Sequence, residues 1–206
     1  MGLVLAFLGW AGAAGATPAN PTADRPGPID RGDDADAAAL LGQPAPGLPP
    51  LHWLDGKTRT LAGLHGQVVV IRSFTEGCPF CASTMPALQQ WHKELGPRGL
   101  QVLGVFHPKP ARPISDAEVA RAARALGVGF PIASDPSWAL VNSWWLRRTR
   151  GRWTSFTFIL DRRGQVRYVH PGGEFHPGGG AAHAVCRDDH QKMRALIETL
   201  LAEAAS

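Results

Sequence analysis

Residues 74–86 read FTEGCPFCASTMP and place Cys78 and Cys81 two residues apart. Residues 67–74, QVVVIRSF, end four positions before Cys78 and form a continuous apolar and β-branched run. Such a run is typical of a strand that is buried on both faces. Pro79 suits the first position of a helix, where a missing N–H costs nothing. The stretch therefore predicts a strand, a Cys-x-x-Cys motif and a helix in direct succession.

Segments on either side of this unit carry further helix and strand patterns. They are the rest of the helix to about Leu95, a strand at 100–106, a helix opened by the capping box Ser115-x-x-Glu118, a short helix at 135–145, strands at 155–161 and 165–170, and an amphipathic helix around 193–201. Parallel strands need crossover helices, whereas the turn Arg163-Gly164 makes the last two strands a hairpin. A short hairpin is also expected around Asp55-Gly56. The order predicts an α/β fold with a mixed central sheet flanked by helices on both faces.

The position of the first cysteine suggests redox chemistry. Cys78 would be the N-cap of the helix, where free N–H groups and partial positive charge favour a thiolate. A thiolate is the attacking species in thiol–disulfide exchange. We therefore expect Cys78 to be the exposed sulfur with the lowered pKa. Cys81 lies one turn further on and is expected to be the buried, resolving sulfur.

A zinc half-site and a structural disulfide are the other readings of this motif. Zinc would need a second ligand pair, and the candidates His176, His183, Cys186 and His190 are irregularly spaced. A disulfide here would close too short a loop to stabilise the fold much. We expect no metal at these tail residues and no cofactor. Cys186 is expected to be simply buried at the start of the last helix; its other possible roles are to resolve a mixed disulfide or to pair between chains.

The chain resembles thioredoxin-fold proteins of the TlpA-like and redoxin type. The resemblance rests on the strand ending at Phe74, the motif Cys78-Pro79-Phe80-Cys81 and the later hairpin FILDRRGQVRYV (158–169). It implies a thioredoxin-like three-layer fold and a thiol–disulfide oxidoreductase, usually periplasmic. It also implies protein thiols or disulfides as substrates and an upstream redox partner.

Three positions depart from the thioredoxin pattern. Arg72 stands where thioredoxins bury a carboxylate, Gly77 replaces a tryptophan, and Ser155 occupies the place of the cis-proline. A cis bond before serine would cost roughly 2.5 to 4 kcal/mol, so we expect a trans peptide between Thr154 and Ser155. The Ser155 N–H or hydroxyl is then expected to point at Cys78. By the same alignment Phe80, Thr154 and Ser155 would bind substrate.

Two other functions remain open. The chain also resembles peroxiredoxins, whose peroxidatic cysteine follows a threonine by three, as Cys78 follows Thr75. At the positions of the peroxiredoxin proline and arginine, however, this chain has Ile71 and Ser155. Arginines that could substitute in space are Arg147, Arg148 and Arg152. The third reading is a non-enzymatic, metal-binding module that uses the two thiols.

The remaining features concern the net charge of the protein, its cellular compartment and its domain boundaries. The 206 residues carry a net charge of +4, which is too mild to indicate nucleic acid binding. Residues 1–16 contain no charge and predict a signal peptide or membrane anchor, so we expect export, most often to the periplasm. Residues 17–41 are expected to be a disordered Ala/Pro/Asp linker and 42–206 the thioredoxin-like domain, acting as a monomer. His107 and the tryptophans are expected to serve as loop and packing residues, although Trp138, Trp144, Trp145 and Trp153 could line a groove.

Overall fold

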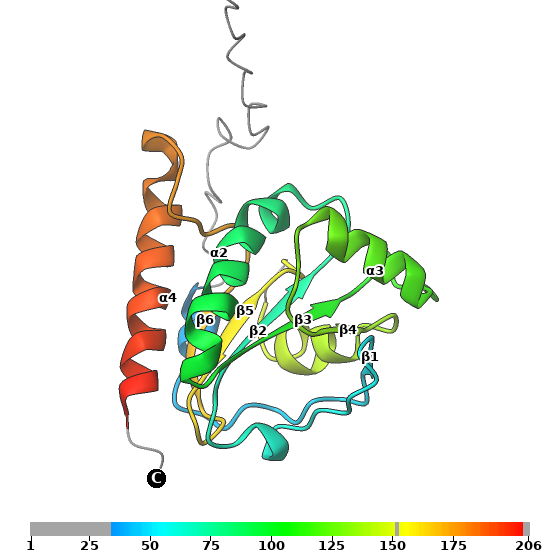
Figure 1. Cartoon of the computed structure of the whole chain (residues 1–206), viewed down its shortest axis with the longest axis horizontal. Coiled ribbons are helices and arrows are strands. Elements are labelled where there is room, and N and C mark those ends of the chain that lie inside the picture. The colour runs from blue at the N-terminus through cyan, green and yellow to red at the C-terminus, as the bar shows by residue number, and fades with distance from the viewer. Residues whose placement is uncertain (1–33, 151–152, 204–206) are drawn as a thin grey trace, which may run out of the picture.

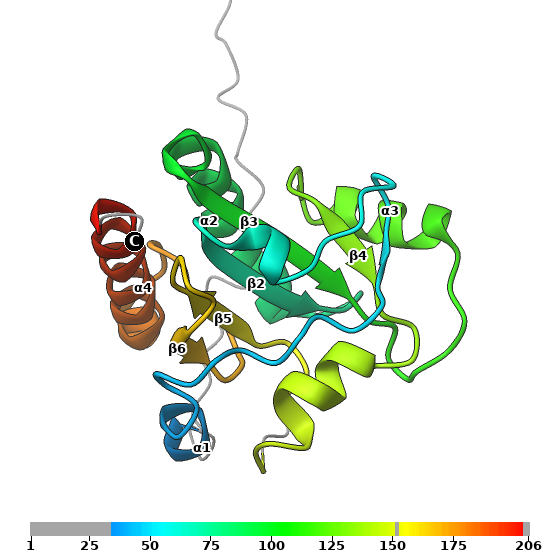
Figure 2. The ribbon, with the colours of Figure 1, turned by 90° about the horizontal axis from the view of Figure 1, so that it is seen from below.

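A six-stranded mixed sheet forms the centre of the computed structural model, which describes residues 34–150 and 153–203 (Figures 1 and 2). The strand order is β1-β4-β3-β2-β5-β6. The strands are β1 (His52–Trp53), β2 (Val68–Phe74), β3 (Leu100–Phe106), β4 (Ile132–Ser134), β5 (Thr157–Leu160) and β6 (Val166–His170). The helices are α1 (Asp34–Ala38), α2 (Pro79–Leu95), α3 (Asp116–Ala125) and α4 (Ala184–Ala202). This architecture confirms the predicted fold class.

Strand β2 occupies the middle of the sheet and leads directly into the motif. It pairs in parallel with β3 and antiparallel with β5, and all seven of its residues are buried. Because side chains alternate between the two faces of a strand, Arg72 shares a face with Val70 and Phe74. Those two residues pack in the core under α2, so Arg72 lies beneath the start of that helix.

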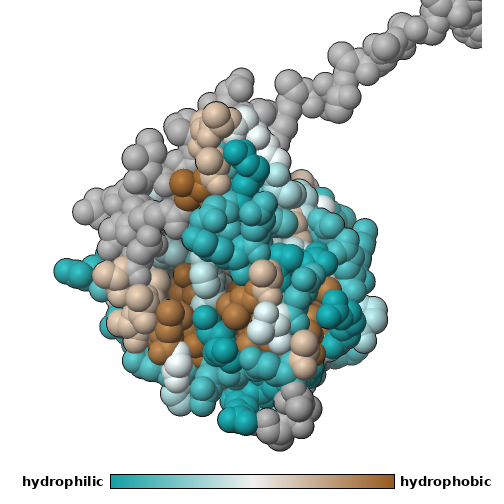
Figure 3. Space-filling view, turned by 90° about the vertical axis from the view of Figure 1, so that its left-hand side faces the viewer, coloured by the Kyte–Doolittle hydropathy of each residue, from teal (hydrophilic) through white to brown (hydrophobic). Residues whose placement is uncertain are grey.

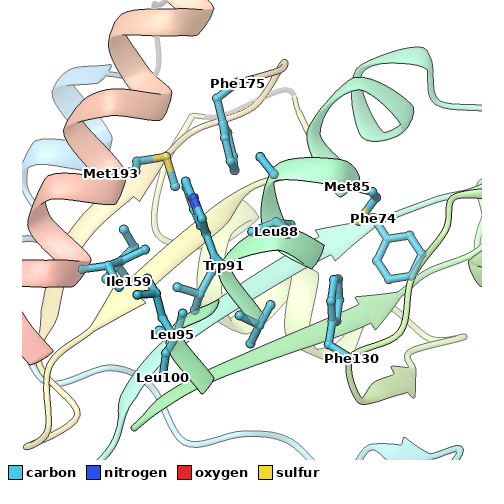
Figure 4. Close-up of a cluster of buried hydrophobic side chains, with 14 of the residues drawn as sticks. Phe74, Met85, Leu88, Trp91, Leu95, Leu100, Phe130, Ile159, Phe175 and Met193 are labelled. Atoms are coloured by element: carbon cyan, nitrogen blue, oxygen red, sulfur yellow. The ribbon is translucent and has the colours of Figure 1, made fainter. Parts of the chain in front are cut away.

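Two hydrophobic cores cover the two faces of the sheet. The first joins the sheet to α2, α3 and α4, with Trp91 and Met193 among its buried residues (Figure 4). The second lies on the opposite face, where Trp144 and Trp145 are fully buried. Seen from the side of α4, the surface is largely hydrophilic with separate hydrophobic patches (Figure 3). Helix α4 therefore buries its apolar stripe and presents its polar residues to solvent.

Several predicted elements appear with the expected boundaries. Helix α2 begins at Pro79 and ends at Leu95, and the capping box at the start of α3 is complete. Strand β3 spans the predicted residues 100–106. The strands of the hairpin are shorter than predicted, since β5 lacks residues 155, 156 and 161 and β6 lacks residue 165.

Other expectations were wrong. There is no hairpin at Asp55-Gly56, because β1 pairs with the unpredicted strand β4. The helix expected at 135–145 is instead a segment of π-type helix over Val141–Leu146. Within the linker expected at 17–41, residues 34–38 form α1, because Ala37 and Leu40 are apolar and pack into the second core. The structure therefore corrects the last part of that linker, and residues 17–33 lie outside the described residues.

The expectations of a signal or anchor concern residues 1–16, which are also outside the described residues. Among the helices that are described, none is long and apolar enough to cross a membrane.

Candidate active site

Cys78 and Cys81 form a pair at the N-terminus of α2. Cys78 is the N-cap, and its Sγ accepts a hydrogen bond from the Cys81 N–H at 3.2 Å. The two sulfur atoms are 2.7 Å apart, and both residues are free thiols. Cys78 is half-buried, whereas Cys81 is fully buried. The predicted cap and the predicted order of exposure are thus confirmed, and Cys78 carries the more accessible of the two sulfur atoms.

Arg72 is a buried cation directly beneath Cys81. Its Nη2 lies 3.9 Å from the Cys81 Sγ and donates to the Gly173 carbonyl at 3.3 Å. Its Nη1 donates to the Thr157 hydroxyl at 3.1 Å. The side chain is completely buried, and within the described residues no carboxylate forms an ion pair with it. A buried charge requires compensation, so the thiolate of Cys81 is the natural counter-ion of Arg72.

The electrostatics of the pair correct one sequence expectation. The pKa of Cys81 is lowered to about 5, first by the hydrogen bond between the two sulfur atoms and then by the charge of Arg72 and the Ser155 hydroxyl. The pKa of Cys78 is raised, by the same sulfur–sulfur hydrogen bond and by burial. The pair therefore shares one proton and one negative charge, and Arg72 and the Ser155 hydroxyl favour that charge on Cys81. We expected the lowered pKa on Cys78; the sulfur–sulfur hydrogen bond is the largest cause of the difference, and Arg72 adds to it.

The segment Thr154–Ser155 faces the dithiol. Among the described residues the one cis peptide bond is Lys109–Pro110, so the peptide before Ser155 is trans, as predicted. The Ser155 Oγ lies 3.4 Å from the Cys81 Sγ and 3.9 Å from the Cys78 Sγ. The hydroxyl was expected at Cys78, but it lies closer to Cys81. The Ser155 hydroxyl and the Arg72 guanidinium therefore both contact the Cys81 sulfur.

His107 holds this segment in place. The ring is completely buried, with Nδ1 3.1 Å from the Ser73 Oγ and Nε2 2.9 Å from the Thr154 Oγ1. Its pKa is lowered to about 3 by burial and by the charges of Lys109 and Arg72. His107 is thus a neutral bridge between β2 and Thr154. His107 was expected to be a loop residue, but its position at the end of β3, beside the end of β2, already indicates a place near the dithiol.

A pocket of about 240 Å³ opens over the exposed sulfur. Its lining includes Cys78 and all three residues expected to bind substrate, Phe80, Thr154 and Ser155. The rings of Phe80 and Trp153 meet edge to face with centroids 5.7 Å apart and form one wall. Trp153 is the one tryptophan of the group that lines this pocket, whereas Trp144 and Trp145 are core residues.

Among the residues that the structure describes, no arginine lines the pocket over Cys78. Thr75 does line the pocket. Arg148 donates instead to the Gln43 side chain, and neither Arg147 nor Arg148 lines the pocket. Arg152 lies outside the described residues. The buried cation Arg72 contacts the second cysteine, and the cation that lines the pocket over Cys78 is Lys109.

A dithiol at a helix N-terminus, set against a mixed sheet, defines a thioredoxin-like protein of the redoxin type. The chain belongs to the AhpC/TSA family, whose model matches residues 41–169. A solved thiol-disulfide isomerase from Corynebacterium glutamicum is similar over 78% of this chain and 98% of its own, with a TM-score of 0.58 and 22% identity.

Curated relatives match over shorter shares of their length. Protein DipZ of Mycobacterium tuberculosis is 30% identical over 120 residues, which are 57% of this chain and 16% of DipZ. A glutathione peroxidase 8-B of Xenopus laevis is 28% identical over 124 residues, 54% of this chain and 58% of that protein. The chain thus spans less than two thirds of either relative.

Proposed function

We propose that this protein is a thiol–disulfide oxidoreductase that exchanges disulfides with protein substrates through Cys78 and Cys81. The observation that carries the proposal is the arrangement of the two sulfur atoms. One is accessible in a pocket, and the other is buried 2.7 Å away against a cation. Membership of the AhpC/TSA family and the similarity to a thiol-disulfide isomerase support it.

The reaction starts with one proton shared between the two sulfur atoms. As Cys78 attacks a substrate disulfide, its proton passes to the Cys81 thiolate along their hydrogen bond. A Cys78–substrate disulfide forms, and the first substrate sulfur leaves as a thiolate. That thiolate takes the proton from Cys81, and the Cys81 thiolate then attacks the Cys78 Sγ. The substrate is reduced by two electrons, and a Cys78–Cys81 disulfide remains for an upstream redox partner to reduce. The reverse sequence oxidises a substrate dithiol.

The pocket favours a protein substrate. Its volume of about 240 Å³ is below the roughly 300 to 1,000 Å³ of typical small-molecule sites. It suits a single side chain beside an exposed disulfide, with Phe80 and Trp153 as the apolar wall. Thr154 and Ser155 lie where they would contact the substrate backbone.

Two assays run on the same preparation test the proposal. We expect the reduced protein to accelerate insulin reduction by a dithiol and to consume hydrogen peroxide at no more than the rate of a free thiol. The physical reason is that Arg72 stabilises charge on Cys81, while none of the arginines that the structure describes lies at Cys78 to polarise a peroxide. Peroxide consumption much faster than insulin reduction would favour a thiol peroxidase, the function that the glutathione peroxidase relative suggests.

We further propose that the protein is exported and acts as a monomer outside the cytoplasm. Support comes from the uncharged residues 1–16, which end in the small-residue pattern Ala14-Gly15-Ala16. Terminal sequencing of protein from the native host should find a mature chain that begins near Thr17. An intact Met1 on a cytoplasmic protein would contradict export.

A further inference from the structure

A second cluster of potential ligands lies outside the dithiol site. Glu174, His176, His183 and Cys186 each offer one ligand atom, and these four atoms all lie within 4.8 Å of one another. We propose that these residues bind one zinc ion. The proposal does not depend on the function proposed for Cys78 and Cys81.

Three separations within the cluster approach those of a tetrahedral site, and all four ligand atoms lie within 4.8 Å of one another. The His183 Nδ1 lies 3.5 Å from one Glu174 carboxylate oxygen and 3.7 Å from the Cys186 Sγ. The other Glu174 oxygen lies 3.8 Å from the His176 Nε2. Zinc–ligand bonds of about 2.0 to 2.3 Å imply ligand atoms roughly 3.3 to 3.8 Å apart around a tetrahedron. One thiolate, two imidazoles and one carboxylate are also a donor set that suits Zn²⁺.

Burial provides an independent argument for a bound cation. Glu174 is 1% exposed, and neither of its carboxylate oxygens accepts a hydrogen bond from the residues that the structure describes. A buried carboxylate without hydrogen bonds is costly unless it is paired or coordinates a metal. The charges of Glu174 and an ionised Cys186 would balance the ion.

The loop from β6 to α4 builds this cluster by folding back on itself. The His176 N–H donates to the Cys186 carbonyl at 3.3 Å, which fixes the loop against the first turn of α4. Gly179 has φ +87°, and a Cβ at this position would lie 2.7 Å from the His183 ring, so glycine allows the close approach. The His176 side chain is 14% exposed, which leaves a route for the ion from solvent.

The proposed zinc site departs from the expectation that the tail binds no metal. That expectation rested on the irregular spacing of His176, His183, Cys186 and His190. The loop brings the first three together and adds Glu174, which the sequence analysis did not consider. His190 packs on Trp91 instead, with ring centroids 5.3 Å apart.

The same loop connects the proposed metal site to the dithiol. Between Glu174 and His176, Phe175 stacks on Trp91 with centroids 5.5 Å apart (Figure 4). Its N–H donates to the Thr84 hydroxyl of α2. The Gly173 carbonyl, next to Glu174, accepts from Arg72. We therefore assign the ion a structural role, holding the loop that supplies one of the partners of Arg72.

Metal titration of the full chain tests this inference. Protein stripped by a chelator should bind one equivalent of Zn²⁺ with a submicromolar Kd, and its Tm should rise on binding. Co²⁺ in place of zinc should give the intense visible bands of a tetrahedral site and a thiolate charge-transfer band. Cys186→Ser should abolish that band and weaken binding at least about tenfold.

Two matched variants keep the test decisive. The double variant Cys78→Ser, Cys81→Ser should bind zinc as the wild type does, which excludes the dithiol as the ligand. Glu174→Gln keeps the shape of the side chain, removes its charge and should also weaken binding, even if Cys186→Ser fails to fold. Substoichiometric zinc in the wild type, or zinc that is lost with the dithiol but kept by Cys186→Ser, would overturn the proposal.

Discussion

Replacing Cys78 by serine is expected to lower the rate of disulfide exchange at least about a thousandfold. A serine hydroxyl remains protonated near neutral pH and does not attack a disulfide sulfur. Cys81 cannot take over, because it is fully buried beneath Cys78. The rate of insulin reduction measures the loss. Far-ultraviolet circular dichroism should show an unchanged fold, since the substitution is nearly isosteric.

The variant Cys81→Ser is the matched control for the order of the two steps. Its Cys78 still attacks the substrate, but nothing resolves the product. A mixed disulfide should accumulate, seen by mass spectrometry as an adduct on Cys78 that a reductant removes. An adduct that forms on Cys81 in the Cys78→Ser variant would show that the two roles are reversed.

The main elements of the fold and the position of the dithiol were predictable because their signals are local. A β-branched run, a proline at the first helical position and a capping box each act within a few residues. They located β2, α2 and α3. The short strands β1 and β4 escaped detection because two or three residues carry no usable periodicity.

The chemistry around the sulfur atoms depends on contacts between distant segments. The sequence placed Arg72 six residues before Cys78, but its partners Thr157 and Gly173 come from β5 and from the loop after β6. The charge distribution of the pair follows from that assembly. Glu174 and Cys186 meet for a similar reason, because a loop without regular spacing returns to α4. Pattern rules that assume fixed ligand spacing cannot find such a site.

Replacing Arg72 by methionine is expected to raise the pKa of Cys81 by roughly one to two units, the usual effect of an opposite charge at this distance. Each unit corresponds to 1.36 kcal/mol, or about 30 mV for a two-electron couple. Because Arg72 stabilises the thiolate, and the thiolate exists only in the reduced protein, its loss favours the disulfide. The reduction potential should therefore fall by about 30 to 60 mV. Equilibration with glutathione measures the potential, and thiolate absorbance against pH measures the pKa.

Two further variants separate charge from packing at this position. Arg72→Lys keeps the positive charge, so its reduction potential should stay close to that of the wild type. It loses, however, the hydrogen bonds to Thr157 and Gly173. Ser155→Ala removes the hydroxyl near Cys81 and should shift the potential in the same direction as Arg72→Met, by a smaller amount, because it removes a dipole and not a charge. Methionine is expected to be tolerated in the fold, because Cys81 can take up a proton and so leaves no uncompensated buried charge. If Arg72→Met folds normally and leaves the pKa and the potential unchanged, the buried guanidinium serves packing alone. In that case the low pKa of Cys81 would arise from Cys78 and the start of α2.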